Sequence, residues 1–175
     1  MHTRLCKVSG SSYLDEKLIA LISQSCVKRR ADNFLFIVDC RPQSSALGTC
    51  KLFLFQLPHI IHMIMIANRA AGAGYESQAN YPTTRLEFFN IPNIHSVKQS
   101  FQKLSALILS GTMNDPYFQK RVDDTMWLLY IRLIIKASWD TASNVVNGIP
   151  VLVHCSHGWD RTSQVCALGN QTFSS

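Results

Sequence analysis

The residues best suited to chemistry lie near the C-terminal end of the sequence, where Cys155 is followed six positions later by Arg161. The chain has six cysteines, and no other cysteine has an arginine at that spacing. A cysteine thiolate is a strong nucleophile, and a guanidinium group binds two phosphate oxygens through parallel hydrogen bonds. The spacing by itself is a weak signal, but the two side chains together suit attack on a phosphate ester.

The sequence around this pair favours a phosphate-binding loop. An apolar run, residues 150–154, ends directly before Cys155, and Gly158 lies in the segment that leads to Arg161. A strand, a tight loop and a helix N-terminus in this order direct backbone N–H groups at an anion. Because such surroundings also lower the pKa of a thiol, we expect Cys155 to be ionised near neutral pH. The loop residues expected to contact substrate are Ser156, His157, Gly158, Trp159 and Thr162.

Four side chains of this segment have more specific expectations. Asp160 lies inside the loop and is the candidate for protonating the leaving oxygen and then activating water against a phosphocysteine. Thr162 is expected to hydrogen-bond the sulfur. Trp159 is either a lid over the substrate ring or a core aromatic. His154 either orders the loop from behind or is a hydrogen-bonded core residue.

Two simpler interpretations compete with the prediction that Cys155 is a nucleophile. His154, Cys155 and His157 resemble part of a metal site, but zinc needs a fourth ligand, and no residue is spaced to supply it. Cys155 and Cys166 could instead both be inert buried thiols, which is the usual state of cysteine. The complete strand, loop and arginine pattern favours the nucleophile, so we predict no metal site.

Such a loop needs a sheet to position it, and the apolar patterning predicts one. Residues 34–38 form an unbroken apolar run typical of a strand buried on both faces of a parallel sheet. Residues 85–91 and 150–154 are two further strand candidates, the second of them buried by composition. Apolar residues at helical spacing predict helices over residues 13–27, after Asn93, and over residues 117–146. This alternation indicates an α/β fold with a mostly parallel central sheet flanked by helices.

The predicted helices have apolar faces and defined ends. The first face consists of Leu14, Leu18, Leu21 and Ile22, and the second consists of Ile94, Val97, Phe101, Leu104 and Ile108. Asn147-Gly148, followed by Pro150, ends the long helix. A short helix of two or three turns follows the loop, and Gly169-Asn170 is its expected stop.

Composition limits the class of protein. The length of 175 residues suits one domain, and 47% hydrophobic against 16% charged residues excludes a disordered chain. The net charge of +6 is spread out, with Lys28-Arg29-Arg30 as its tight cluster. An anionic small molecule or lipid head group therefore fits better than nucleic acid. Without an apolar signal peptide or a regular cysteine framework, we expect reduced thiols and a cytoplasmic protein.

Several motifs resemble the myotubularin phosphatases. Residues 154–162, His-Cys-Ser-His-Gly-Trp-Asp-Arg-Thr, match that family's His-Cys-Ser-Asp-Gly-Trp-Asp-Arg-Thr loop at eight of nine positions. Residues 39–42 are similar to the family's Asp-x-Arg-Pro strand end. Residues 67–76 are similar to its Ala-Asn-Arg-Ala-x-Gly-x-Gly-Tyr-Glu segment, and residues 93–95 match a further signature. The resemblance therefore identifies a cysteine-phosphatase-like fold.

The resemblance implies removal of the 3-phosphate from phosphatidylinositol 3-phosphate and from the 3,5-bisphosphate. It makes Cys155 the nucleophile, Arg161 the phosphate ligand and Asp160 the general acid, with Asn68 lining the substrate pocket. It implies no metal or organic cofactor and no nucleic acid partner. It also implies peripheral contact with endosomal membranes and a dimer with a related phosphatase.

The sequence departs from the family pattern in three places. His157 stands where the family has Asp, which removes an acceptor near the inositol and predicts an altered activity or pH dependence. Residues 47–66 are nearly uncharged and too short to span a membrane, and we interpret them as an atypical apolar insertion rather than a core or membrane-contacting segment.

The third departure is that the sequence contains only part of the family's phosphatase domain. Residues 1–175 are expected to form a partial phosphatase domain, incomplete at the C-terminus, with weak or absent catalysis. A catalytically inactive scaffold or adaptor, or a dual-specificity protein phosphatase, is the alternative. Retention of both Cys155 and Arg161 favours an enzyme over the scaffold, and Trp159-Asp160 within the loop argues against a protein phosphatase.

Overall fold

The computed structural model of the chain describes residues 13–24, 34–46, 81–111 and 115–172. Two sequence predictions, the substrate-pocket residue Asn68 and the insertion over residues 47–66, lie outside the described residues. The elements in chain order are α1 (Tyr13–Gln24), β1 (Leu35–Asp39), α2 (Gln43–Ala46), β2 (Thr84–Phe88), α4 (Ile94–Leu109), α5 (Phe118–Asp124), α6 (Trp127–Val146), β3 (Val151–His154) and α7 (Arg161–Gln171).

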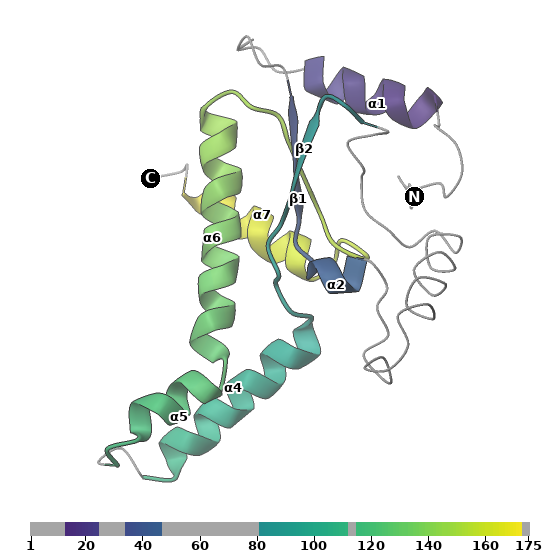
Figure 1. The fold of residues 1–175 in the computed structure, drawn as a ribbon. Coiled ribbons are helices and arrows are strands. Elements are labelled where there is room, and N and C mark those ends of the chain that lie inside the picture. The colour runs from purple at the N-terminus through teal and green to yellow at the C-terminus, as the bar shows by residue number, and fades with distance from the viewer. Residues whose placement is uncertain (1–12, 25–33, 47–80, 112–114, 173–175) are drawn as a thin grey trace, which may run out of the picture.

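The described strands form a parallel sheet in the order β2-β1-β3. Helices flank it: α6 and α7 lie along one face, while α1 lies on the other side of β1 (Figure 1). The predicted α/β class, with a parallel sheet flanked by helices, is confirmed. All described helices are too short or too polar to cross a membrane.

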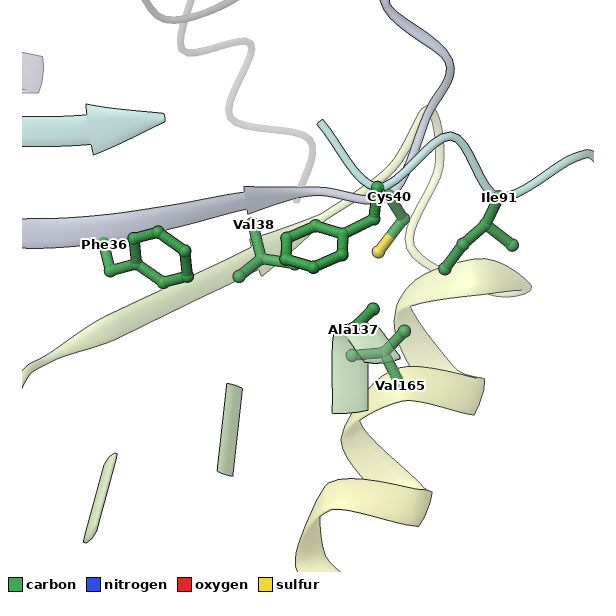
Figure 2. Close-up of a cluster of buried hydrophobic side chains, with 7 residues drawn as sticks. Phe36, Val38, Cys40, Ile91, Ala137 and Val165 are labelled. Atoms are coloured by element: carbon green, nitrogen blue, oxygen red, sulfur yellow. The ribbon is translucent and has the colours of Figure 1, made fainter. Parts of the chain in front are cut away.

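The central strand β1 is buried on both faces, as its unbroken apolar run predicts. Because successive strand side chains point to opposite faces, β1 contributes to two cores. Phe36 and Val38 join a cluster with Ala137 of α6 and Val165 of α7, which Figure 2 shows together with Cys40. The other face carries a second cluster, formed by Ile19, Leu35, Ile37 and Tyr81.

The strand β3 is less buried than its composition suggests. All four of its residues are only partly buried, so the prediction of a buried strand is wrong. The reason is its place in the sheet, because β3 pairs with β1 alone among the described strands and forms an edge. This edge strand leads directly into the predicted phosphate-binding loop.

The single long helix predicted over residues 117–146 is wrong as well, because the structure divides it into α5 and α6. The break lies at Met126, whose φ of 65° is left-handed and cannot continue a right-handed helix. The preceding Thr125 is buried, and its hydroxyl donates to the carbonyl of Val122 at 2.6 Å. The chain thus turns between two helices that both pack against α4.

The helices that flank the sheet expose much of their predicted apolar faces. In α1, Ile19 is 3% exposed, whereas Leu14, on the predicted face, is 74% exposed. The helix is therefore rotated from the orientation that its apolar spacing suggests. In α4, both Phe101 and Ile108 are about half exposed.

The last helix, α7, continues through its predicted stop at Gly169-Asn170 and ends at Gln171. Gly169 is buried within the helix, and a Cβ atom built there would lie 3.4 Å from the Ser138 carbonyl of α6. The glycine therefore serves a close approach of two helices rather than a helix end. The predicted length of two or three turns is correct, since α7 has 11 residues.

Candidate active site

The candidate site lies at the carboxyl edge of the sheet, where β1 and β3 end side by side. Asp39 and His154 are register partners at the two strand ends, and the backbone N–H of Cys40 donates to the His154 carbonyl at 2.9 Å. Cys155 follows directly. In an open parallel α/β sheet this edge is the usual position of a ligand site.

The thiol of Cys155 is surrounded by hydrogen-bond donors. Burial alone raises its pKa, but the Thr162 hydroxyl and the backbone N–H groups of Thr162, His157 and Gly158 lower it more strongly, from 9.0 to about 7. The Gly158 N–H donates to Sγ at 3.3 Å. The Thr162 hydroxyl is buried and has no hydrogen bond of regular geometry within the described residues. These donors therefore favour the thiolate form of Cys155 near neutral pH.

The other two described cysteines have a raised rather than a lowered thiol pKa. Burial and the nearby Cys155 and Asp39 raise the pKa of Cys40 to about 12, and burial also raises the pKa of Cys166. Figure 2 shows the Cys40 sulfur directed toward Ala137 and Val165 in the apolar core. Among the described cysteines, Cys155 is thus the one whose surroundings lower the pKa of the thiol.

The guanidinium of Arg161 lies beside the loop, and not all of its N–H donors are used by the protein. Its two Nη atoms donate to the Ser156 hydroxyl at 3.3 Å and to the Ile91 carbonyl at 3.4 Å, both long contacts. Its Nε is buried and has no acceptor among the described residues. A buried donor of this kind normally has a partner, and a phosphate oxygen is an acceptor of suitable charge.

The carboxylate of Asp160 is held from two directions. Its Oδ2 accepts from the backbone N–H of Ile94, the first residue of α4, at 3.1 Å. Its Oδ1 accepts from the Gln164 side-chain amide, one turn further along α7, at 2.6 Å. The side chain predicted to transfer protons is thereby fixed in orientation beside the loop.

The loop itself turns at Gly158, whose φ of +83° lies in the left-handed region that favours glycine. Ser163 donates its hydroxyl to the Gly158 carbonyl at 3.1 Å and ties the turn to α7. Trp159 is 76% exposed, so its interpretation as a core aromatic is wrong. Its ring meets the exposed His157 ring edge-on, with 6.1 Å between the centroids.

Behind the loop, a buried ion pair supports the strand ends. The fully buried Asp39 carboxylate accepts from Arg41 through Nε and Nη2, the latter at 2.6 Å. The Nε2 atom of His154 lies 3.9 Å from Asp39 Oδ2. His154 thus lies behind the loop, in contact with a buried charge, as one of its two sequence interpretations expects.

The structure places the predicted residues 155–160 in one loop and residues 161–162 at the start of α7. It adds three residues that sequence reasoning missed: Ile91, Ile94 and Gln164. Ile91 and Ile94 act through their backbones, which no side-chain pattern reveals. The spacing of Gln164, four residues after Asp160 on a predicted helix, was a usable signal. No group of three metal-ligating side chains occurs within the described ranges.

Comparison with known proteins finds one family match and several relatives. The profile of the "Myotubularin-like phosphatase domain" family matches residues 59–172. The chain is 37% identical over 157 residues to phosphatidylinositol-3,5-bisphosphate 3-phosphatase MTMR6 of Mus musculus, which covers 89% of this chain. It is 36% identical to the human enzyme of the same description, MTMR8, and 34% identical to human phosphatidylinositol-3-phosphate phosphatase MTMR7, which cover 89% and 97% of this chain.

The matched regions are a small part of these relatives. The chain spans 22% of the mouse MTMR6 sequence, 19% of MTMR8 and 24% of MTMR7, or about a fifth of their length.

Proposed function

The chain belongs to the myotubularin-like phosphatase family, and from this premise we propose that its site removes the 3-phosphate from phosphoinositide lipids. The proposed substrates are phosphatidylinositol 3-phosphate and phosphatidylinositol 3,5-bisphosphate, since the relatives are named for these two lipids. The observation that carries the proposal is the acidic thiol of Cys155, with a pKa of about 7, in a loop whose Ser156 hydroxyl accepts from Arg161 at the start of α7.

In the proposed first step, Cys155 Sγ attacks phosphorus and the bond between phosphorus and the inositol oxygen breaks. The electron pair goes to that oxygen, which takes a proton from Asp160. Arg161 binds two phosphate oxygens, with its unpartnered Nε as one donor. The loop N–H groups that now stabilise the thiolate also face the developing negative charge on the phosphate.

In the second step, water attacks the phosphorus of the phosphocysteine. Asp160, now ionised, accepts a proton from that water, and the electron pair of the breaking S–P bond returns to Sγ. Inorganic phosphate leaves, and both the thiolate and the protonated carboxyl are restored. The cycle needs no metal and no redox cofactor, because a single acid–base residue and a nucleophile complete it.

The test is phosphate release from the two lipids in mixed micelles. We expect the unchanged chain to release phosphate and Cys155→Ser to release none, because a serine hydroxyl is not ionised at neutral pH. Cys166→Ser is the matched control, since Cys166 is a half-buried thiol on the neighbouring helix. Release that persists in Cys155→Ser would contradict the proposed nucleophile. An unchanged chain that releases none would contradict the proposal and favour an inactive scaffold or adaptor.

A substrate panel separates lipid from protein phosphatase activity. We expect turnover of the lipids and none of phosphotyrosine or phosphoserine peptides. The reverse preference would favour a dual-specificity protein phosphatase.

Membrane contact, endosomal location and a dimer with a related phosphatase stay predictions. The exposed Trp159 at the loop suits contact with a lipid surface, because tryptophan favours the boundary between water and acyl chains. Sedimentation with vesicles that contain phosphatidylinositol 3-phosphate tests this, with Trp159→Ala expected to bind less than the unchanged chain.

A further inference from the structure

Gln164 is a half-buried residue of α7 whose side chain points back along the helix to the loop. Its amide Nε2 donates to Asp160 Oδ1 at 2.6 Å, and its backbone N–H donates to the Asp160 carbonyl at 3.1 Å. The two residues are four apart, the spacing at which side chains on one face of a helix meet. Gln164 therefore contacts Asp160 through both its backbone and its side chain.

The second oxygen of Asp160 is occupied by a different element. Oδ2 accepts from the N–H of Ile94 at 3.1 Å, at the exposed N-terminus of α4. Asp160 is also the N-cap residue of α7, yet its side chain makes no capping bond to that helix. The carboxylate is thus oriented by one donor on each side, of which only Gln164 is a side chain.

We propose that Gln164 is a positioning residue that aims the Asp160 carboxyl at the leaving oxygen of the substrate. The inference rests on the proposed function, in which Asp160 transfers protons. Proton transfer requires the carboxyl within hydrogen-bond distance of its target, and a carboxylate held by one donor turns about its side-chain bonds. Each oxygen accepts one bond here and keeps a second lone-pair position for the transferred proton.

Two variants of Gln164 remove the donor in different ways. Gln164→Glu keeps the size and shape but replaces the NH₂ group with a negatively charged oxygen, which repels the Asp160 carboxylate. Gln164→Leu removes the polar group at similar volume. The matched control is Gln171→Leu, which makes the same substitution at an exposed position of the same helix.

The readout compares two substrates that differ in their need for an acid. The inositol oxygen of phosphatidylinositol 3-phosphate leaves as an alkoxide unless it is protonated, whereas the acidic phenol of an aryl phosphate leaves as a phenolate without a proton. We expect kcat/KM for the lipid, which reports the step in which the inositol oxygen leaves, to fall about tenfold to hundredfold in both Gln164 variants, part of the usual contribution of a general acid. The kcat/KM for the aryl phosphate is expected to change little, because its phenolate leaves in that step without a proton. The kcat is expected to fall for both substrates, since Asp160 also activates the water of the second step.

A structural role for Gln164 predicts a different pattern. Equal loss of kcat/KM on both substrates, or a lipid kcat/KM that stays unchanged, would overturn the inference while leaving Cys155-dependent turnover by the unchanged chain intact. An unchanged chain that hydrolyses neither substrate would overturn the proposed function and the inference with it. Thermal unfolding of each variant shows whether it is folded. If Gln164→Leu does not fold, the isosteric Gln164→Glu still decides the test.

Discussion

At the scale of single residues, the same thiol group has opposite properties at two neighbouring positions. Cys40 and Cys155 follow register-paired strand ends. The sulfur of Cys155 faces backbone N–H donors, whereas that of Cys40 lies in the apolar cluster. Their pKa values of about 7 and about 12 lie on either side of the usual value for cysteine. Surroundings rather than residue type therefore decide which thiol reacts.

This difference predicts selective alkylation of Cys155. Because a lowered pKa means that the thiolate is lost only as the pH falls below about 7, we expect the rate of carboxamidomethylation at Cys155 to be half-maximal near pH 7. Below that it should fall about tenfold per pH unit. Peptide mass spectrometry after timed exposure to iodoacetamide measures it, with Cys40 as the internal control. Equal rates at both cysteines at pH 7 would contradict the prediction.

The sequence is sufficient to identify the local part of the site. Cys155 and Arg161 are close in sequence, and the loop that joins them follows a recognisable strand. The contacts that orient the loop are not local: Ile94 and Asp160 are 66 positions apart, and Ile91 and Arg161 are 70 apart. Such pairs depend on how the strands order themselves in the sheet, which the chain's local patterns do not encode.

At the scale of elements, backbone conformation overrides helical patterning at Met126. The apolar spacing runs through this position without interruption, yet Met126 adopts φ 65°. An L-residue in that conformation is strained by contact of its Cβ with the backbone. The strand and helix types were predictable from apolar spacing, whereas this break was not, because it depends on one buried threonine turn.

The strained backbone at Met126 predicts that a substitution by asparagine is more stable there than one by isoleucine. We expect Met126→Asn to be more stable than Met126→Ile by about 1 kcal/mol, because asparagine tolerates the left-handed region and a β-branched residue does not. Urea unfolding measures the difference. Leu128, on the exposed part of the adjoining helix, is the control, where the same two substitutions should show no such preference for asparagine.

The close approach of α6 and α7 gives a second prediction at this scale. Gly169→Leu introduces a Cβ 3.4 Å from the Ser138 carbonyl and further atoms beyond it. We expect a loss of about 1–3 kcal/mol in the free energy of unfolding, as for other overpacked sites. Ala167→Leu, exposed on the same helix, should change it by less than about 0.5 kcal/mol. A Gly169→Leu variant as stable as its control would show that the helices separate freely.

At the scale of the whole molecule, one buried charge links the sheet to the site. Asp39 is fully buried at the end of the central strand, is paired with Arg41, and lies near His154 of the neighbouring strand. A buried pair stabilises little over an apolar replacement, but removal of one partner leaves an uncompensated charge. The carboxylate thus supports the strand ends that carry the loop.

Asp39→Asn tests this role. We expect the free energy of unfolding to fall by about 3 kcal/mol, because the Arg41 guanidinium loses its charged partner in a mostly buried position. Chemical denaturation measures it. Glu87→Gln removes the same charge from an exposed pair between β2 of the same sheet and Lys136 of α6 and should cost less than about 1 kcal/mol. Equal losses would contradict the prediction.

The long-range bonds between the loop and the segment before α4 also bear on folding kinetics. Closing a connection of 66 positions is slow and entropically costly, and it precedes any gain from the contact. The loop of the proposed phosphate site is therefore expected to reach its final arrangement with the sheet rather than before it. A phosphate analogue that binds the native state alone will stabilise it against unfolding in proportion to the logarithm of its concentration. The rate at which such binding appears during refolding then measures the rate of the last folding step, in which the loop and the start of α4 come together.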